Sequence, residues 1–242
     1  MPKQDLKKSL CLSKTNISGG GYRKYLKLIR DAGLEVNFVH LGYRVNSGIA
    51  TIWEEGEAGD ELVRDYLKDL EIVAKDGIKM VCMHVTKSNK QSPMSEIGLS
   101  RWRKIVKKAE ELGIVVTLEN TVWKGYLEFI LDNIKSDNLA VCYDSGHAHF
   151  HFQDDYNFNK FKGKIACLHL HDNDGTADQH LLPMDGSIDW NGLLQKLKKA
   201  NFCGDFTSEA VRHENYKNLT PLQFFKEQKK RLEKLQDMFS DL

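Results

Sequence analysis

The feature that most limits what this chain can fold into is a repeated alternation of short apolar segments with amphipathic helical patterns. Residues 78–85 and 114–120 are apolar almost throughout, as expected for strands that are buried on both faces of a parallel sheet. Helical patterns follow these segments, and Gly33, Gly77 and Gly113 mark helix ends. One strand and one helix recur roughly every 30 residues, as in consecutive βαβ units. The sequence therefore predicts a parallel α/β domain.

The length and order of the predicted elements fit a (β/α) barrel, which usually needs roughly 250 residues. The chain has 242 residues and shows no composition change that would mark a linker, so residues 1–242 are predicted to form a single domain. The predicted strands cover residues 9–12, 35–43, 78–85, 114–120, 139–147, a segment from residue 165, and residues 204–211. The predicted helices cover residues 22–32, 61–76, 99–112, 123–134, 190–200 and 222–238.

Six predicted strands each end in an acidic residue or a histidine. In a parallel barrel, active-site groups converge at the carboxyl ends of the strands. A chain that needed only packing would not place so many costly polar groups after apolar strands. We therefore expect a metal site at this end, built from some or all of His40, His84, Glu119, Asp144, His169 and Glu209.

Residues 165–190 and the DSGH motif supply further ligand-type side chains. In DSGH, Asp144 and His147 are three residues apart across an expected tight turn. In DQH, Asp178 and His180 are expected on one side of an extended loop, because side chains alternate there with a period of two. Histidine and carboxylate ligands suit Zn²⁺, Mn²⁺, Co²⁺ or Fe²⁺, and imidazoles disfavour Mg²⁺.

The composition limits which classes of binding partner and which cellular compartment we expect. The formal net charge is +1, from 35 basic and 34 acidic residues, so no overall field favours nucleic acid or an anionic membrane. No apolar run reaches the roughly 20 residues of a membrane span, and the lysine-rich N-terminus does not resemble a signal peptide. Cys82, Cys142 and Cys167 lie in apolar strands without a CxxC pair, which is typical of reduced core cysteines. We expect a cytoplasmic protein.

Taken together, these motifs resemble the xylose isomerase-like TIM barrel superfamily, from about residue 22 to the last strand. The resemblance rests on LEN at Glu119, DSGH at Asp144, HLHDND at His169, DQH, GSIDW and SEA at Glu209, in this order and spacing. The superfamily contains sugar isomerases and epimerases and also the endonuclease IV abasic-site nucleases. The resemblance identifies the superfamily and leaves the substrate open.

The resemblance implies specific roles for these residues. In the sugar epimerases, one divalent metal is held by two Glu, one Asp and one His, which match Glu119, Glu209, Asp144 and His169. The two Glu residues also form the acid/base pair, and the DSGH histidine contacts substrate. The nuclease branch holds three zinc ions with these four positions and five others, which match His40, His84, His147, Asp178 and His180.

Two departures from the family pattern affect these expectations. Only about 20 residues precede the helix at residues 22–32, so the barrel is predicted to be incomplete or distorted at its N-terminal βα unit. The loop after His169 reads HDND and lacks the lysine that the nucleases have there. An unclosed barrel exposes sheet edges, which favours a homodimer.

The lead hypothesis is a metal-dependent isomerase or epimerase that acts on a small sugar or sugar phosphate. Glu119 or Glu209 removes a proton α to a carbonyl, and the metal stabilises the resulting enediolate. One alternative is hydrolysis of abasic DNA by a three-metal cluster, against which the near-zero net charge counts. The other alternative is a degenerate barrel without activity.

Overall fold

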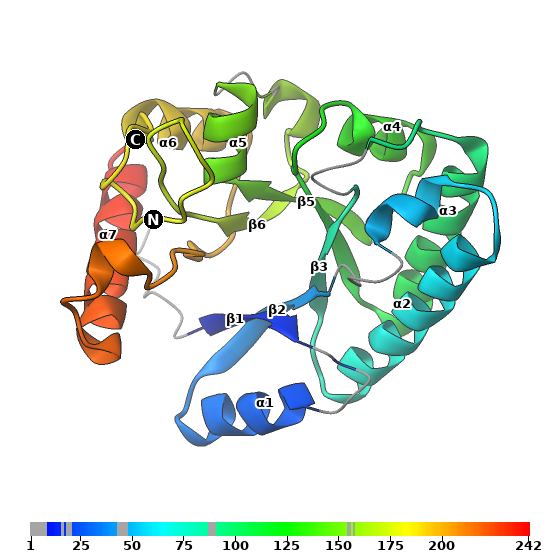
Figure 1. Ribbon diagram of the computed structural model, residues 1–242, viewed down its shortest axis with the longest axis horizontal. Helices are drawn as coiled ribbons and strands as arrows, with labels where there is room; N and C mark the ends of the chain where they lie inside the picture. Colours follow the sequence, from blue (N-terminus) through cyan, green and yellow to red (C-terminus); the bar gives the residue numbers. More distant parts are fainter. Residues whose placement is uncertain are drawn as a thin grey trace. The chain divides into compact units, whose positions relative to one another are not determined.

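The computed structural model describes residues 9–15, 17, 21–42, 48–86, 91–153, 156 and 158–242. Tyr43, at the end of one predicted strand, lies outside these residues, and that strand ends at Leu41. The elements, labelled in Figure 1, are β1 (Ser9–Thr15), α1 (Gly21–Asp31), β2 (Glu35–Leu41), η1 (Ile49–Trp53), α2 (Glu57–Lys75), β3 (Met80–His84), α3 (Glu96–Leu112), β4 (Val115–Glu119), α4 (Tyr126–Asn133), β5 (Leu139–Asp144), α5 (Ser145–Phe152), η2 (Phe158–Phe161), β6 (Ile165–His169), α6 (Trp190–Lys199), η3 (Glu214–Tyr216) and α7 (Pro221–Ser240).

The described chain divides into two compact units. We call Lys7–Val141 the N-terminal unit and Cys142–Leu242 the C-terminal unit. Strand β5 carries the chain from the first unit into the second. The assignment of residues 1–242 to a single domain stays a prediction.

In the N-terminal unit the strands follow chain order, and each of the pairs β1–β2, β2–β3 and β3–β4 is parallel. The register places His40 beside Cys82 and His84 beside Glu119. The central residues of β3 and most residues of β4 are buried, in agreement with their apolar sequence. The pairing therefore brings polar residues from three strands to the same end of the sheet.

Helices α2 and α3 pack against each other on this unit (Figure 1). Helix α3 begins at Glu96, three residues before its predicted start, because the Ser95 hydroxyl accepts a hydrogen bond from the Gly98 N–H and caps the helix. Its end is as predicted, since Gly113 adopts a left-handed conformation with φ of 63°. The apolar repeat thus located the helix, and the cap determined its first residue.

The buried Arg101 of α3 anchors the segment before α2. Its guanidinium donates to the Thr51 carbonyl at 3.1 Å, the Gly56 carbonyl at 2.9 Å and the Asp60 carboxylate at 3.0 Å. Gly59 has no side chain at the point where the guanidinium passes, because a Cβ there would lie 2.2 Å from Nη1 of Arg101. One charged side chain therefore links η1 and the following turn to the start of α2.

In the C-terminal unit, the DSGH motif starts a helix where the sequence predicted the end of a strand. Strand β5 ends at Asp144, and the side chain of Asp144 caps α5 by accepting a hydrogen bond from the His147 N–H at 2.7 Å. The predicted strand over residues 139–147 is therefore wrong for its last three residues. An aspartate before Ser-Gly is a favourable N-cap, which explains the change.

The predicted strand over residues 204–211 is reduced to a parallel bridge between Leu170 and Ser208. The Leu170 N–H donates to the Thr207 carbonyl at 2.8 Å, and the Glu209 N–H donates to the Leu170 carbonyl at 3.0 Å. The segment then leaves the ladder, because the Val211 N–H donates to the His180 carbonyl of the loop after β6 at 2.9 Å. Within the described residues there are thus six strands and one bridged segment, fewer than the eight of a complete barrel.

The loop between β6 and α6 is organised by the buried carboxylate of Asp172. Its oxygens accept hydrogen bonds from the backbone N–H groups of Met184 at 2.9 Å and Ile188 at 3.2 Å, and from the Trp190 indole at 2.8 Å. Gly186 must lack a side chain, because a Cβ there would lie 2.3 Å from Oδ1 of Asp172. The GSIDW motif therefore wraps around one carboxylate.

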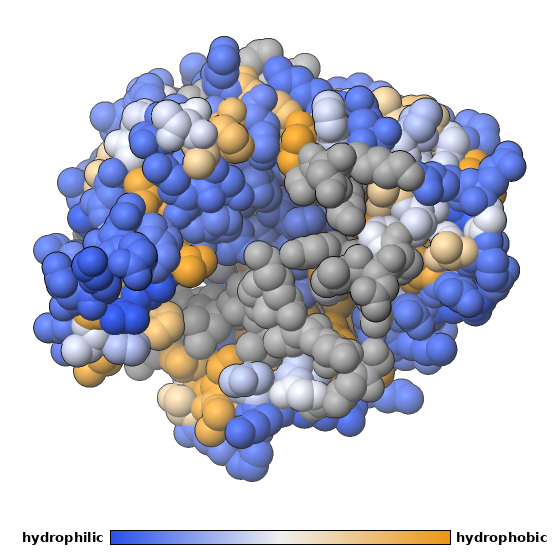
Figure 2. All heavy atoms as spheres, in the orientation of Figure 1, coloured by the Kyte–Doolittle hydropathy of each residue, from blue (hydrophilic) through white to orange (hydrophobic). Residues whose placement is uncertain are grey.

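The face shown in Figure 2 is mainly hydrophilic, with scattered apolar groups. Among the described residues, large exposed apolar side chains include Leu222 and Phe225 of α7 and Tyr25 and Leu28 of α1. None of the described helices combines the length and the apolar character that crossing a membrane requires.

Candidate active site

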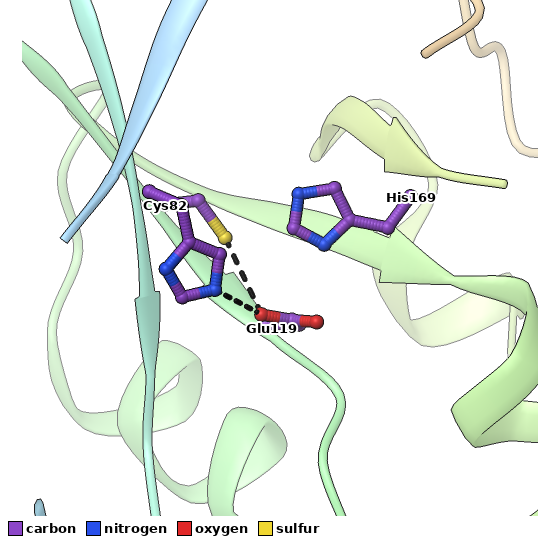
Figure 3. A group of neighbouring side chains, drawn as sticks. Cys82, Glu119 and His169 are labelled. Atoms are coloured by element: carbon purple, nitrogen blue, oxygen red, sulfur yellow. Dashed lines mark hydrogen bonds and ion pairs between the residues drawn. The ribbon is translucent and has the colours of Figure 1, made fainter. Parts of the chain in front are cut away.

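In the N-terminal unit, three predicted strand-end residues meet at one carboxylate oxygen. Nε2 of His40 lies 2.9 Å and Nε2 of His84 lies 3.1 Å from Oε2 of Glu119. The Cys82 thiol donates to the same oxygen at 3.6 Å (Figure 3). His40, Cys82 and Glu119 are fully buried. The sheet register described above produces this cluster, since the residues come from adjacent positions of β2, β3 and β4.

In the C-terminal unit, a second cluster joins the ends of β5 and β6 to the bridged segment. Nδ1 of His169 lies 3.5 Å from Oε2 of Glu209 and 3.9 Å from Oδ2 of Asp144. One donor atom from each of these three residues lies within 4.8 Å of the others. Asp144 and His169 are buried, and Glu209 is only partly exposed. Two carboxylates and an imidazole at this separation suit a divalent transition metal ion.

Beside this cluster, Asp178 bridges two histidines. Its Oδ2 lies 3.5 Å from Nε2 of His147 and 3.3 Å from Nε2 of His180. Burial alone would lower the pKa of His180, but its hydrogen bond to Asp178, together with the charges of Asp178, Asp144 and Glu209, outweighs burial and raises the pKa to about 9. Burial likewise opposes ionisation of Asp178, yet the hydrogen bonds from His147 and His180 hold its pKa well below the usual range. The metal-free pair is therefore ionic at neutral pH.

Two of the histidines have the ring orientation that metal ligands usually have. Nδ1 of His40 lies 2.9 Å from the Leu41 carbonyl oxygen, and Nδ1 of His180 lies 3.0 Å from the Glu209 carbonyl oxygen. Because a carbonyl only accepts, each Nδ1 carries a proton and Nε2 faces the carboxylates. Metal-binding histidines commonly donate one ring N–H to a backbone carbonyl in this way. Within each unit, the residues present therefore fit a divalent ion.

The structure brings the predicted site residues together in two groups. His40, His84 and Glu119 meet in the N-terminal unit, and the other six, which are Asp144, His147, His169, Asp178, His180 and Glu209, lie in contact in the C-terminal unit. The DQH pair is adjacent as predicted, but its backbone is not extended, because His180 has a φ of 50°. The ligand and catalytic roles stay predictions.

Two residues beside the predicted ligands also contact the clusters. The sequence leaves His171 as a candidate for supporting a ligand or shaping the loop, and in the structure it is fully buried with Nε2 only 3.0 Å from Oδ1 of Asp144. Its position two residues after His169 was an available signal, since alternate residues of a strand share a face. Cys82 was expected only as a core residue, and its contact with Glu119 depends on strand register, which the sequence does not specify.

The comparisons with known proteins agree with this arrangement of strands and motifs. A family model described as "Xylose isomerase-like TIM barrel" matches residues 4–239. The chain belongs to this family. The predicted superfamily and the predicted fold class, an incomplete TIM-type α/β barrel, are thereby confirmed.

Several solved structures share the fold of this family member at low sequence identity. A D-tagatose 3-epimerase-like protein has a TM-score of 0.75 and 20% identity, with 96% of this chain and 88% of that chain covered. The IolI protein with a bound zinc atom has a TM-score of 0.75 and 17% identity, with coverage of 96% and 89%. The 3-keto-D-glucoside 4-epimerase YcjR from E. coli has a TM-score of 0.66 and 18% identity, with coverage of 89% and 85%.

Among curated sequences, the uncharacterized protein MJ1614 of Methanocaldococcus jannaschii is 30% identical over 148 residues, which is 57% of each chain. A second protein of that organism, MJ1311, is 32% identical over 133 residues, which is 50% of this chain and 45% of MJ1311. The chain thus spans about half the length of the curated relatives that it matches.

Proposed function

We propose that the protein is a divalent-metal-dependent isomerase or epimerase of a small sugar or sugar phosphate. The observation that carries the proposal is the meeting of Asp144, His169 and Glu209 at the end of β6, with donor atoms within 4.8 Å of one another. Zn²⁺, Mn²⁺ and Co²⁺ suit these donors better than Mg²⁺. The fold is shared with proteins named as sugar epimerases and with the zinc-bound IolI structure.

In this proposal, Asp144 and His169 hold the ion and Glu209 both binds it and transfers a proton. A bound divalent ion supplies Lewis acidity, which makes the hydrogen α to a substrate carbonyl easier to remove. The Glu209 carboxylate would accept this proton, which converts the substrate to an enediolate. A proton is then returned to the opposite face of the same carbon in an epimerase, or to the neighbouring carbon in an isomerase. The sequence resemblance assigns Glu119 as the fourth ligand and the second acid/base group.

The surroundings of Glu209 support this role. The Glu209 N–H donates a hydrogen bond to the Leu170 carbonyl, and the Glu209 carbonyl accepts one from Nδ1 of His180. The main chain of Glu209 is therefore held on both sides. Its side chain keeps 16% of its surface exposed, whereas the His169 side chain keeps 1%. A base must be fixed in place and still reach substrate, and Glu209 meets both requirements. His147 and His180 are proposed to contact the substrate hydroxyls.

The proposal is tested with the metal-reconstituted enzyme and a panel of ketoses and ketose phosphates in D₂O. We expect turnover and deuterium incorporation at the carbon α to the carbonyl, with both lost in Glu209→Gln and Glu119→Gln. The matched control is Glu214→Gln, because Glu214 lies in the same unit with its side chain 87% exposed and paired with Lys217. Full turnover by both active-site variants on a confirmed substrate would refute the assignment.

One observation also favours a second candidate, an endonuclease IV-like phosphodiester hydrolase at abasic sites. Asp178 lies between His147 and His180, at the positions that the resemblance assigns to an additional zinc ion of those nucleases. Metal analysis distinguishes the two functions. Three tightly bound zinc ions with incision of an abasic duplex would replace the isomerase proposal, and one ion without incision supports it.

A further inference from the structure

His171 makes a buried contact with the capping carboxylate of α5. Its Nε2 lies 3.0 Å from Oδ1 and 3.2 Å from Oδ2 of Asp144, and both residues are fully buried. A carboxylate that is ionised only accepts hydrogen bonds, so Nε2 carries the hydrogen of this contact. The N–H thus spans both oxygens and opposes rotation of the carboxylate plane.

The two oxygens of Asp144 have different surroundings. Oδ1 accepts the hydrogen bond from the His147 N–H at 2.7 Å and so caps α5. Oδ2 lies 3.6 Å from Nδ1 of His147 and 3.9 Å from Nδ1 of the proposed ligand His169. Because one oxygen serves the helix, the orientation of the plane decides where the second oxygen points. The His171 contact therefore bears on metal geometry.

His171 itself sits in a closely fitted slot. A Cβ on Gly146 would lie only 1.9 Å from Cε1 of His171, so the glycine of DSGH makes room for this ring. On another side the ring stacks on His180, with centroids 3.9 Å apart and planes at 9°. The backbone is held by Ser145, whose Oγ accepts from the His171 N–H at 3.0 Å and donates to its carbonyl at 2.7 Å.

The stacking argues against His171 as a ligand of the same ion as His180. Donor atoms of His171, His180 and Glu209 do lie within 4.8 Å of one another. However, an imidazole binds a metal in the plane of its ring, and two nearly parallel rings 3.9 Å apart do not share such a plane. Nε2 of His171 is moreover directed at Asp144. The ring contacts a proposed ligand instead of acting as one.

We propose that His171 is a positioning residue, which fixes the carboxylate of Asp144 so that Oδ2 is presented to the divalent ion. This inference rests on the proposed function and adds a residue to its site. Ligating carboxylates are commonly held by hydrogen bonds of this kind, and removal of such a partner typically lowers metal affinity about 10- to 100-fold.

The test uses the full-length, metal-stripped protein titrated with Co²⁺, followed by its visible absorption spectrum and by competition with a chelating dye. His171→Gln keeps an N–H donor near the position of Nε2, and His171→Leu removes it. We expect His171→Gln to keep the wild-type spectrum and affinity, and His171→Leu to bind about 10- to 100-fold more weakly with a changed spectrum. The matched control is His149→Leu on α5, whose Nε2 instead contacts the Ser187 hydroxyl at 2.8 Å.

Each outcome decides the inference. Unchanged Co²⁺ affinity and spectrum in His171→Leu would overturn the inference, and so would an equal loss of affinity in the Gln and Leu variants. Either result leaves metal binding by the wild type, and therefore the proposed function, intact. A wild-type protein that binds no divalent ion would overturn the proposed function itself. If His171→Leu does not fold, ¹⁵N NMR of the wild type decides: a protected Nε2–H of His171 is required, and the Nδ1–H tautomer refutes the inference.

Discussion

The His180–Asp178 pair makes the stability of the metal-free protein depend on pH. The pKa of His180 is about 9 in the folded protein, against about 6.5 in an unfolded chain. The folded state therefore holds the extra proton between these two values, and the free energy of unfolding falls as pH rises through this window. The stabilisation is complete below about pH 6.5 and is lost above about pH 9.

The size of the effect follows from the shift. A change of about 2.5 units corresponds to about 3 kcal/mol, most of which is still present at pH 7 and nearly all of which is lost at pH 10. The side chains of His180 and Asp178 are 20% and 29% exposed, so solvent screens the pair only in part. Because the pKa of Asp178 is lowered in the folded protein, Asp178 stays ionised in both states across this window. The pH dependence in this window therefore comes from the titration of His180 alone.

The assay is urea unfolding of the chelator-treated protein at pH 6.5 and pH 10, for wild type and His180→Gln. We expect the stability difference between the two proteins to be about 3 kcal/mol at the lower pH and to vanish at the higher pH. His213→Gln is the control, because a neutral ring suffices at His213: Nε2 meets the Gln179 carbonyl at 2.8 Å and Nδ1 accepts from the Asn215 N–H. A difference between wild type and His180→Gln that is the same at both pH values would refute the reasoning.

Three other substitutions test the packing that supports the site, each by its urea midpoint. Asp172→Asn withdraws an ionic acceptor from two backbone N–H groups and the Trp190 indole, and we expect a loss of about 2 kcal/mol; an unchanged midpoint would contradict the loop-organising role. Gly98→Ala places a Cβ 2.2 Å from the buried Trp53 ring, so we expect a loss of about 1–3 kcal/mol and a change in tryptophan fluorescence; an unchanged midpoint would contradict the close packing of this ring. Arg101→Met removes the hydrogen-bond donor of several carbonyls in η1 and the following turn, and we expect a loss of about 3 kcal/mol. An unchanged midpoint would contradict the anchoring role of Arg101.

Much of the fold could be predicted because strands and helices are encoded locally. The apolar run over residues 78–85 and the glycine stop at Gly113 each depend on a few neighbouring residues. The first forms a strand over the shorter range Met80–His84, and the second ends α3 as predicted. Errors arose where a tertiary contact competed with the local pattern. Asp144 ended its strand by capping a helix, and Val211 left the bridged segment to pair with the loop at His180.

The candidate site divides in the same way. By itself, the sequence determined which residue types end the strands and in what order, because an acid or a histidine after an apolar strand is visible without any distant partner. Only the tertiary structure decided that two imidazoles and the Cys82 thiol share one oxygen of Glu119, since strand register sets that contact. It also decided that Gly146 makes room for the ring of His171, because residues 25 positions apart meet only when α5 packs beside the end of β6.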